Sequence, residues 1–175
     1  MKPSKEIVEF IKKYESLHDG DLNVIGLQPK LDGAGIWTEG WGHAMRRNAK
    51  FMRLKDYPTL ESILPYRKIK TLEEADCYLA ADIAKAAQLV RRNLKIRVSQ
   101  NEFDALLSHC YNCGVSGTLY KRVNGKTSKA AIKDWFVNRY ITAQGIPLRG
   151  LQYRRNDEWE IFAGINYKRE YKLSV

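Results

Sequence analysis

The 175-residue sequence predicts an α+β protein in which a small antiparallel sheet is set apart from a mainly helical region. Two observations support this fold class. A glycine-rich stretch over residues 32–43 is typical of a tight β-hairpin, whereas residues 71–163 repeatedly show apolar residues at helical spacing. Because the helical patterns follow the strand-like stretch and do not alternate with it, we expect the sheet to be segregated in one lobe.

A first helix is predicted over residues 4–15. Ser4 is a favourable N-cap, and a core-facing stripe follows at helical spacing, formed by Ile7, Phe10, Ile11 and Tyr14. Glu15 ends this helix on its apolar side. Apolar neighbours and the negative end of the helix dipole favour a protonated carboxyl, which suits a general acid. A partly exposed glutamate in a salt bridge is the alternative.

The stretch Asp32-Gly-Ala-Gly-Ile-Trp-Thr38-Glu-Gly-Trp-Gly-His43 predicts a tightly turned β-hairpin. Its glycines permit positive φ and close backbone approach, while Ile36, Thr38 and Trp41 favour extended backbone. Asp32 lies at the entrance of the hairpin and Thr38 on it. A glycine-rich turn in a sheet is the simpler interpretation, and an acid and a hydroxyl held at fixed spacing for catalysis is the alternative.

The remaining elements are predicted from prolines, helix-capping residues and the spacing of apolar residues. Residues 22–43 are expected to form short strands, and residues 44–70 to be irregular because Pro58 and Pro65 limit any helix there. Four helices are predicted beyond this region, at about residues 71–93, 99–114, 128–140 and 151–163. The first two of these open with capping boxes, Thr71-x-x-Glu74 and Ser99-x-x-Glu102.

The composition limits the possible partners and cofactors. A net charge of +10 indicates attraction to polyanions, such as nucleic acid, anionic lipid or an anionic cell-wall polymer. We expect no nucleic-acid partner, because no basic run reaches five residues and no binding motif is evident. The three cysteines do not form a disulfide framework, and Cys110 and Cys113 lack a second ligand pair, so we expect no metal or cofactor. We also expect neither a signal peptide nor a transmembrane segment.

Three segments, in the right order, resemble the phage-type (T4-lysozyme-like) lysozymes or endolysins, glycoside hydrolase family 24. The pattern Asp32-x5-Thr38 followed by x-Gly-x-Gly-His43 is similar to the active-site hairpin of this family. Residues 99–114 resemble its central core helix, and residues 150–158, with two adjacent arginines, resemble its C-terminal helix.

This resemblance implies a single lysozyme-like domain. A sheet lobe would cover about residues 16–70 and a long connecting helix about residues 71–93. A helical lobe would cover about residues 94–175 together with the first helix, residues 4–15.

The resemblance also implies a catalytic site of Glu15, Asp32 and Thr38. Glu15 would be the general acid, while Asp32 and Thr38 would position the water of an inverting hydrolysis. The implied substrate is peptidoglycan, cut at the β-1,4 bond between N-acetylmuramic acid and N-acetylglucosamine. The gap between Glu15 and Asp32 is longer than is usual in this family, which makes Asp19 and Asp21 the alternative second carboxylates. The fixed spacing of the hairpin favours Asp32.

Further site residues are implied in the same way. Gly42, Tyr111, Asn112 and Arg154 are expected to bind substrate, and Arg154, or else Arg155, to pair with Glu15. From the sequence alone Asn112 has either a C-capping or a ligand role, and the resemblance favours the ligand. His43 is expected to form a structural salt bridge with Asp82.

The resemblance implies a monomeric endolysin that stays in the host bacterial cytoplasm until a holin-like membrane protein releases it to the cell wall. Two alternatives stay open. One is a lytic transglycosylase, and the other is a non-catalytic basic protein that binds the wall or nucleic acid.

Overall fold

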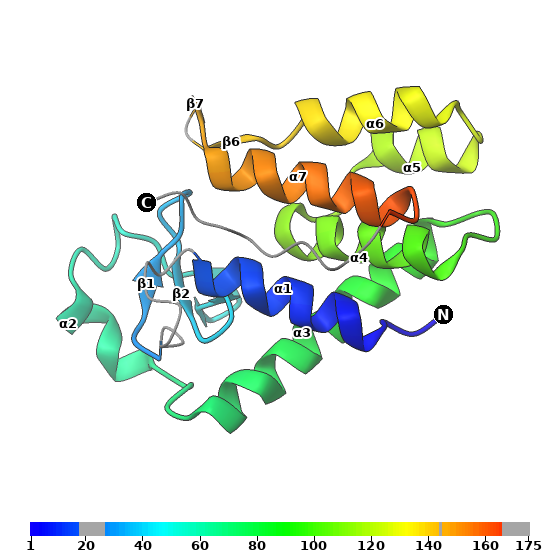
Figure 1. Cartoon of the computed structure of the whole chain (residues 1–175). Helices are drawn as coiled ribbons and strands as arrows, with labels where there is room; N and C mark the ends of the chain where they lie inside the picture. Colours follow the sequence, from blue (N-terminus) through cyan, green and yellow to red (C-terminus); the bar gives the residue numbers. More distant parts are fainter. Residues whose placement is uncertain (18–26, 144, 166–175) are drawn as a thin grey trace. The chain divides into compact units, whose positions relative to one another are not determined.

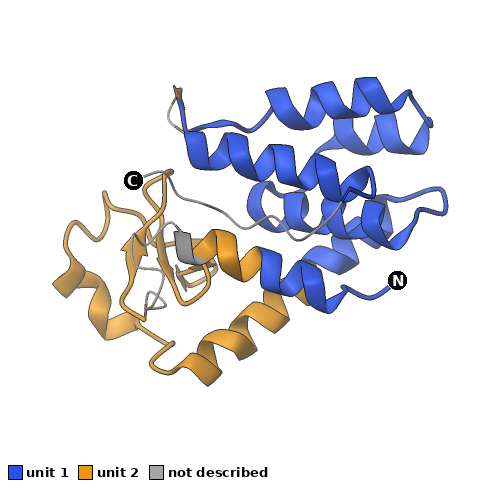
Figure 2. Ribbon diagram, viewed as in Figure 1, with its two compact units in different colours: residues 1–10, 86–142, 147–175 blue, residues 11–85, 143–146 orange. Residues whose placement is uncertain are grey.

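The computed structural model describes residues 1–17, 27–143 and 145–165. Asp19 and Asp21, the alternative second carboxylates, lie outside the described residues. The chain divides into two compact units, coloured separately in Figure 2. Unit 1 consists of residues 1–10, 86–142 and 147–175, and unit 2 of residues 11–85 and 143–146. Both α1 (Lys5–Leu17) and α3 (Leu72–Asn93) therefore contribute to each unit.

The sheet of unit 2 forms where the glycine-rich hairpin was predicted (Figure 1). It contains β1 (Lys30–Leu31), β2 (Trp37–Glu39) and β3 (His43–Ala44), antiparallel and in that spatial order. Thr38 stands opposite Lys30 on one side and Ala44 on the other. Alternation along β2 buries Trp37 and Glu39 on one face and leaves Thr38 on the other.

Residues 44–70 are more regular than expected. They hold a second hairpin, β4 (Arg46–Arg47) and β5 (Lys50–Phe51), then α2 (Leu60–Ile63) and a 3₁₀ turn, η1 (Leu64–Tyr66). The prediction failed because packing orders this region: Met45, Met52 and Ile63 form a buried cluster with Trp37. Pro65 lies in the first turn of η1, where its missing N–H costs no hydrogen bond.

Unit 1 is built from α4 (Gln100–Cys113), α5 (Gly117–Asn124), α6 (Lys129–Asn138) and α7 (Arg149–Phe162). The capping box at Ser99 and Glu102 is confirmed, and α4 ends at Gly114 with φ of 76°. The sequence missed α5, whose buried face has only three residues, and a short hairpin made of β6 (Thr142–Ala143) and β7 (Ile146–Pro147).

The start of the chain is bound into unit 1. The Ser4 N–H donates to Asp104 Oδ1 over 3.3 Å, and Gln100 Nε2 donates to the Lys2 carbonyl over 2.9 Å. In unit 2, the predicted capping box of α3 is present, since Thr71 and Glu74 exchange side-chain to backbone bonds of 3.2 Å. Across the described part of the chain, no helix is both long enough and apolar enough to cross a membrane.

Candidate active site

Glu15 lies in the last turn of α1 and is half-buried. Its carboxylate lies directly against Gly42, in the turn between β2 and β3. A Cβ placed on Gly42 would be only 2.5 Å from Glu15 Oε2 and 3.2 Å from Cδ. The φ of Gly42 is 78°, a conformation that side chains other than glycine rarely adopt. The backbone of this turn therefore leaves room for the carboxylate, and the structure brings two of the predicted site residues together.

Asp32 is exposed and caps the turn between β1 and β2. Its Oδ1 accepts two backbone hydrogen bonds of 2.8 Å, from the N–H groups of Ala34 and Ile36. The turn is closed by backbone bonds from Asp32 N to Ile36 O and from Gly35 N to Asp32 O. The hairpin therefore fixes the carboxylate through one oxygen. Within the described residues Oδ2 accepts no hydrogen bond, which leaves it available to a water molecule.

Thr38 occupies the middle of β2 and is half-buried. Its hydroxyl donates to the carbonyl of Lys30 over 3.1 Å, across the β1–β2 pair. Because the hydroxyl hydrogen is used in this bond, the Thr38 oxygen is oriented to accept a hydrogen bond from another group. Asp32 and Thr38 therefore offer two oriented acceptors on one hairpin.

A cluster that the sequence did not reveal lies beside Glu15 and Gly42. Asp76 of α3 accepts from Trp41 Nε1 over 2.7 Å and pairs with Lys12 Nζ over 2.8 Å, both through Oδ1. The Lys12 ammonium also lies 5.2 Å from the centre of the Trp41 ring. Burial alone would raise the pKa of Asp76, but the hydrogen bonds from Lys12 and Trp41 outweigh it and lower the pKa below its usual value.

This cluster, here called the Asp76 strut, joins α1, α3 and the β2–β3 turn. Lys12 is one helical turn before Glu15, and Trp41 directly precedes Gly42. The strut therefore ties together the two segments that carry the Glu15–Gly42 contact. No local pattern in the sequence marks the strut, because Lys12, Trp41 and Asp76 are far apart in the chain.

Two further carboxylates support the sheet. Glu39 is 2% exposed, and its Oε2 accepts from the backbone N–H groups of Lys68 and Ile69, each over 2.9 Å. The predicted pair of His43 and Asp82 is confirmed, with 2.5 Å between Nδ1 and Oδ2. Burial raises the pKa of Asp82, but hydrogen bonds from His43 and Lys85 outweigh it and lower this pKa below its usual value.

The paired arginines of α7 are fully buried in unit 1 and do not form a solvated helix face. Glu158 lies between them, with 3.4 Å from its Oε1 to Arg154 Nε and 3.1 Å from its Oε2 to Arg155 Nη1. Ser108 Oγ donates to Glu158 Oε1 over 2.7 Å. Burial and the two nearby guanidinium groups lower the pKa of His109 to about 2, so this imidazole is neutral.

Asn112 is bound to this buried network. Its Oδ1 accepts from Arg155 Nη2 over 2.6 Å. It does not cap α4, because Gly114 is the C-cap and donates its N–H to the Cys110 carbonyl over 2.8 Å. The substrate-binding roles of Asn112, Tyr111 and Arg154, and the pairing of Arg154 with Glu15, stay predictions. In the described ranges, no three His, Cys, Asp or Glu side chains group together as ligands for a metal ion.

Comparison with known proteins identifies a family, a relative and two solved structures that this chain resembles. The sequence profile described as Phage lysozyme matches residues 22–158, a range that includes Asp32 and Thr38 and begins after Glu15. The endolysin of Acyrthosiphon pisum secondary endosymbiont phage 1 is 28% identical over 166 residues, which cover 91% of this chain and 96% of that protein.

Two solved structures share the fold over nearly the whole chain. The endolysin from Escherichia coli O157:H7 phage FAHEc1 has a TM-score of 0.67 and 29% identity, covering 93% of each chain. The muramidase domain of SpmX from Asticaccaulis excentricus has a TM-score of 0.64 and 26% identity, covering 92% of this chain and 97% of that one. They confirm a lysozyme-like α+β fold. With a family match that extends over most of its length, the chain belongs to the phage lysozyme family.

Proposed function

We propose that Glu15, Asp32 and Thr38 together hydrolyse the β-1,4 bond between N-acetylmuramic acid and N-acetylglucosamine. Its family and relatives make the chain a glycoside hydrolase that lyses bacterial peptidoglycan. The residues and the bond are our proposal. The observation that carries it is the contact of the Glu15 carboxylate with Gly42. Gly42 lies in the turn that follows β2, while Thr38 lies on β2 and Asp32 in the turn that precedes it.

The local geometry suits a division of roles. Glu15 is half-buried behind the core stripe of α1, a setting in which a glutamate can act as the proton donor to the leaving oxygen. Asp32 is exposed, with one oxygen fixed by backbone donors and the other available, as a general base needs. Thr38 would accept a hydrogen bond from the attacking water. Attack by this water from the opposite face of the sugar inverts the anomeric centre.

The test is Glu15→Gln, assayed by clearing of outer-membrane-permeabilised bacteria. The amide keeps the shape of the side chain but cannot donate the proton, so turnover should fall about 10²–10⁴-fold. Glu9→Gln is the matched control, because Glu9 lies on the same helix and is exposed. Near-normal clearing by Glu15→Gln, with purified protein that is folded by circular dichroism, would contradict the assignment.

The product distinguishes hydrolysis from its main rival. A reducing N-acetylmuramic acid end, seen by mass spectrometry, is the expected result, with inverted configuration by early-time NMR. An anhydro sugar would identify a lytic transglycosylase and would remove the role given to Asp32 and Thr38.

We further propose that the enzyme acts as a monomer and is released from the host cytoplasm by a holin-like membrane protein. This proposal rests on its likeness to phage endolysins. Expression in bacteria with and without a holin tests the release, since lysis should begin only when the holin is present. Sedimentation tests the monomer.

A further inference from the structure

The β4–β5 hairpin carries a dense group of exposed cations. Residues 46–55, here called the basic hairpin, contain no Asp or Glu. They contain five exposed cations, namely Arg46, Arg47, Lys50, Arg53 and Lys55. The hairpin lies entirely within unit 2 and is anchored by Met45 and Met52, which are buried against Trp37.

The register of this hairpin brings like charges together. Arg47 stands directly opposite Lys50, an arrangement that destabilises an antiparallel pair. The turn between them is made by Asn48 and Ala49, with φ of 50° and 62°. Alanine is a poor residue for this conformation, in which glycine is favoured. Neither the Arg47–Lys50 pairing nor the alanine in the turn helps the hairpin to fold. A bound anion would make the pairing favourable, because it would neutralise the two like charges.

Two of the cations are held in place by aromatic rings. The Arg46 guanidinium lies 3.8 Å from the centre of the Phe51 ring and donates to the Ala49 carbonyl over 3.3 Å. The Arg47 guanidinium lies 4.7 Å from the centre of the Tyr66 ring and donates to its hydroxyl over 2.7 Å. Because each guanidinium has five N–H donors, both retain donors for a ligand. Their ordering before binding reduces the entropic cost of holding one.

We propose that the basic hairpin binds a phosphodiester-linked polyol polymer of the bacterial cell wall, with Arg47 and Lys50 sharing one phosphate group. The planar fork of a guanidinium matches the oxygens of a phosphate, and an ammonium beside it adds a second positive charge. The inference rests on the proposed function, because an enzyme that lyses the wall works among the polymers attached to it.

Two other polyanions fit this surface less well. Single-stranded nucleic acid binds by stacking its bases on aromatic faces, but one face of Phe51 and one of Tyr66 already carry guanidinium groups. A membrane surface is bound by inserting apolar or tryptophan side chains, but the tip of this hairpin is Asn48 and Ala49. Its other exposed apolar side chains are Phe51, which carries the Arg46 guanidinium, and Leu54, which follows β5. A repeating phosphate on a polyol backbone needs neither free aromatic faces for stacking nor apolar side chains for insertion.

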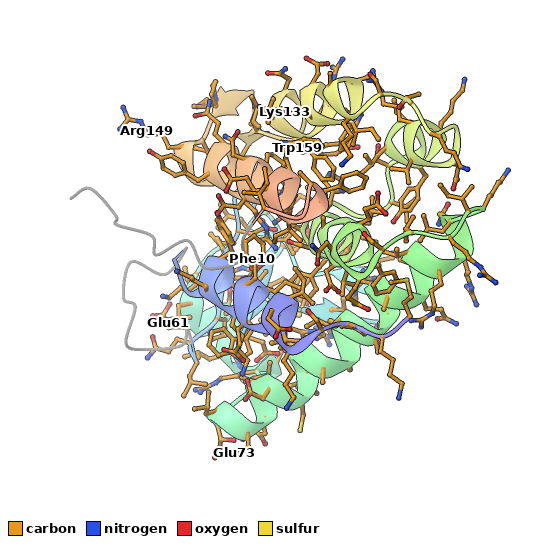
Figure 3. The ribbon with its side chains drawn as sticks, turned by 45° about the vertical axis from the view of Figure 1, so that its right-hand side comes forward. Phe10, Glu61, Glu73, Lys133, Arg149 and Trp159 are labelled. Carbon is orange, nitrogen blue, oxygen red and sulfur yellow. The ribbon has the colours of Figure 1, made fainter. Side chains whose placement is uncertain are left out.

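The test is binding of purified poly(glycerol phosphate) to the double variant Arg47→Gln/Lys50→Gln, measured by titration calorimetry. The matched control is Lys129→Gln/Lys133→Gln, which removes the same charge from exposed positions on α6 (Lys133 is labelled in Figure 3). The hairpin variant should bind about tenfold more weakly, as expected for two exposed charge contacts. The control variant should stay within about twofold of the wild type. Equal losses in both variants would overturn the proposal.

Duplex DNA and vesicles of phosphatidylglycerol serve as competing probes. Either of them binding more tightly than the polymer, with the same dependence on Arg47 and Lys50, would also overturn the proposal. The binding assay needs no turnover, and cleavage of phosphate-free peptidoglycan fragments should be unchanged in Arg47→Gln/Lys50→Gln. Wild-type protein that binds the polymer but cleaves no peptidoglycan would contradict the proposed function alone. Wild-type protein that cleaves peptidoglycan but does not bind the polymer would contradict this inference alone.

Discussion

Replacing Gly42 by alanine should inactivate the enzyme at a modest cost in stability. Two effects act together at this position. Its φ of 78° makes any side chain unfavourable by about 1–2 kcal/mol, and the new Cβ would lie 2.5 Å from Glu15 Oε2. Because Oε2 is the end of a flexible side chain, the carboxylate can retreat to an ordinary contact at about 3.4 Å. Glu15 would then move by roughly 1 Å, a displacement that can lower a rate about a hundredfold.

The assay for Gly42→Ala combines a thermal melt with kinetics on permeabilised cells. The melting temperature should fall by about 2–8 °C, which corresponds to the backbone cost in a chain of this size. Gly164→Ala is the matched control, because Gly164 has φ of 79° but its new Cβ would meet its nearest neighbour, Asn101, at an ordinary 3.5 Å. The control should lose similar stability and keep its turnover. Normal turnover in Gly42→Ala, or an equal loss of turnover in Gly164→Ala, would refute the argument.

Substitutions at three further residues test the other contacts. Asp82→Asn should lower the free energy of unfolding by about 1 kcal/mol at neutral pH. Since the folded-state pKa of Asp82 is lowered, the difference from wild type should vanish as the pH falls through that pKa, and a pH-independent difference in chemical denaturation would contradict this. Asn112→Ala should destabilise the fold by about 1–3 kcal/mol, because it leaves a buried Arg155 donor without its acceptor. If Asn112→Ala also raises KM, the result would support a sugar contact. An unchanged melting temperature of this variant would contradict the Arg155 bond. Asp76→Ala should lower kcat with little change in KM, and Asp76→Asn, which can still accept from Trp41, should recover part of it; full activity of Asp76→Ala would exclude a positioning role.

Local signals in the sequence were enough to predict most elements of the fold. The hairpin that starts at Asp32 and the capping boxes at Thr71 and Ser99 depend on residues a few positions apart, so their patterns are visible in the chain itself. The β4–β5 hairpin depends on Met45 and Met52 packing against Trp37. Its turn has no glycine, and nothing local marks it.

In the candidate site too, features within one local segment could be predicted, whereas contacts between distant residues could not. The spacing of Asp32 and Thr38 is a property of one hairpin and could be interpreted directly. The contact of Glu15 with Gly42 joins residues far apart in the chain, and the sequence could only supply each of them separately. Adjacent arginines on a helix usually face solvent, so the burial of Arg154 and Arg155 around Glu158 had no local signal.

Most of unit 2, residues 11–85, is made well before the last helix of unit 1, although residues 143–146 of unit 2 come later. Residues 1–10 precede the other segments of unit 1 in the chain, and α7, the last of the described helices of this unit, ends at Phe162. At ribosomal rates of about 5–20 residues per second, this segment waits roughly 8–30 s for its partners. Nearly all of unit 2 has emerged well before then. Ile7, which is fully buried in the finished protein, is therefore exposed on the nascent chain for most of its synthesis, when a chaperone can bind it.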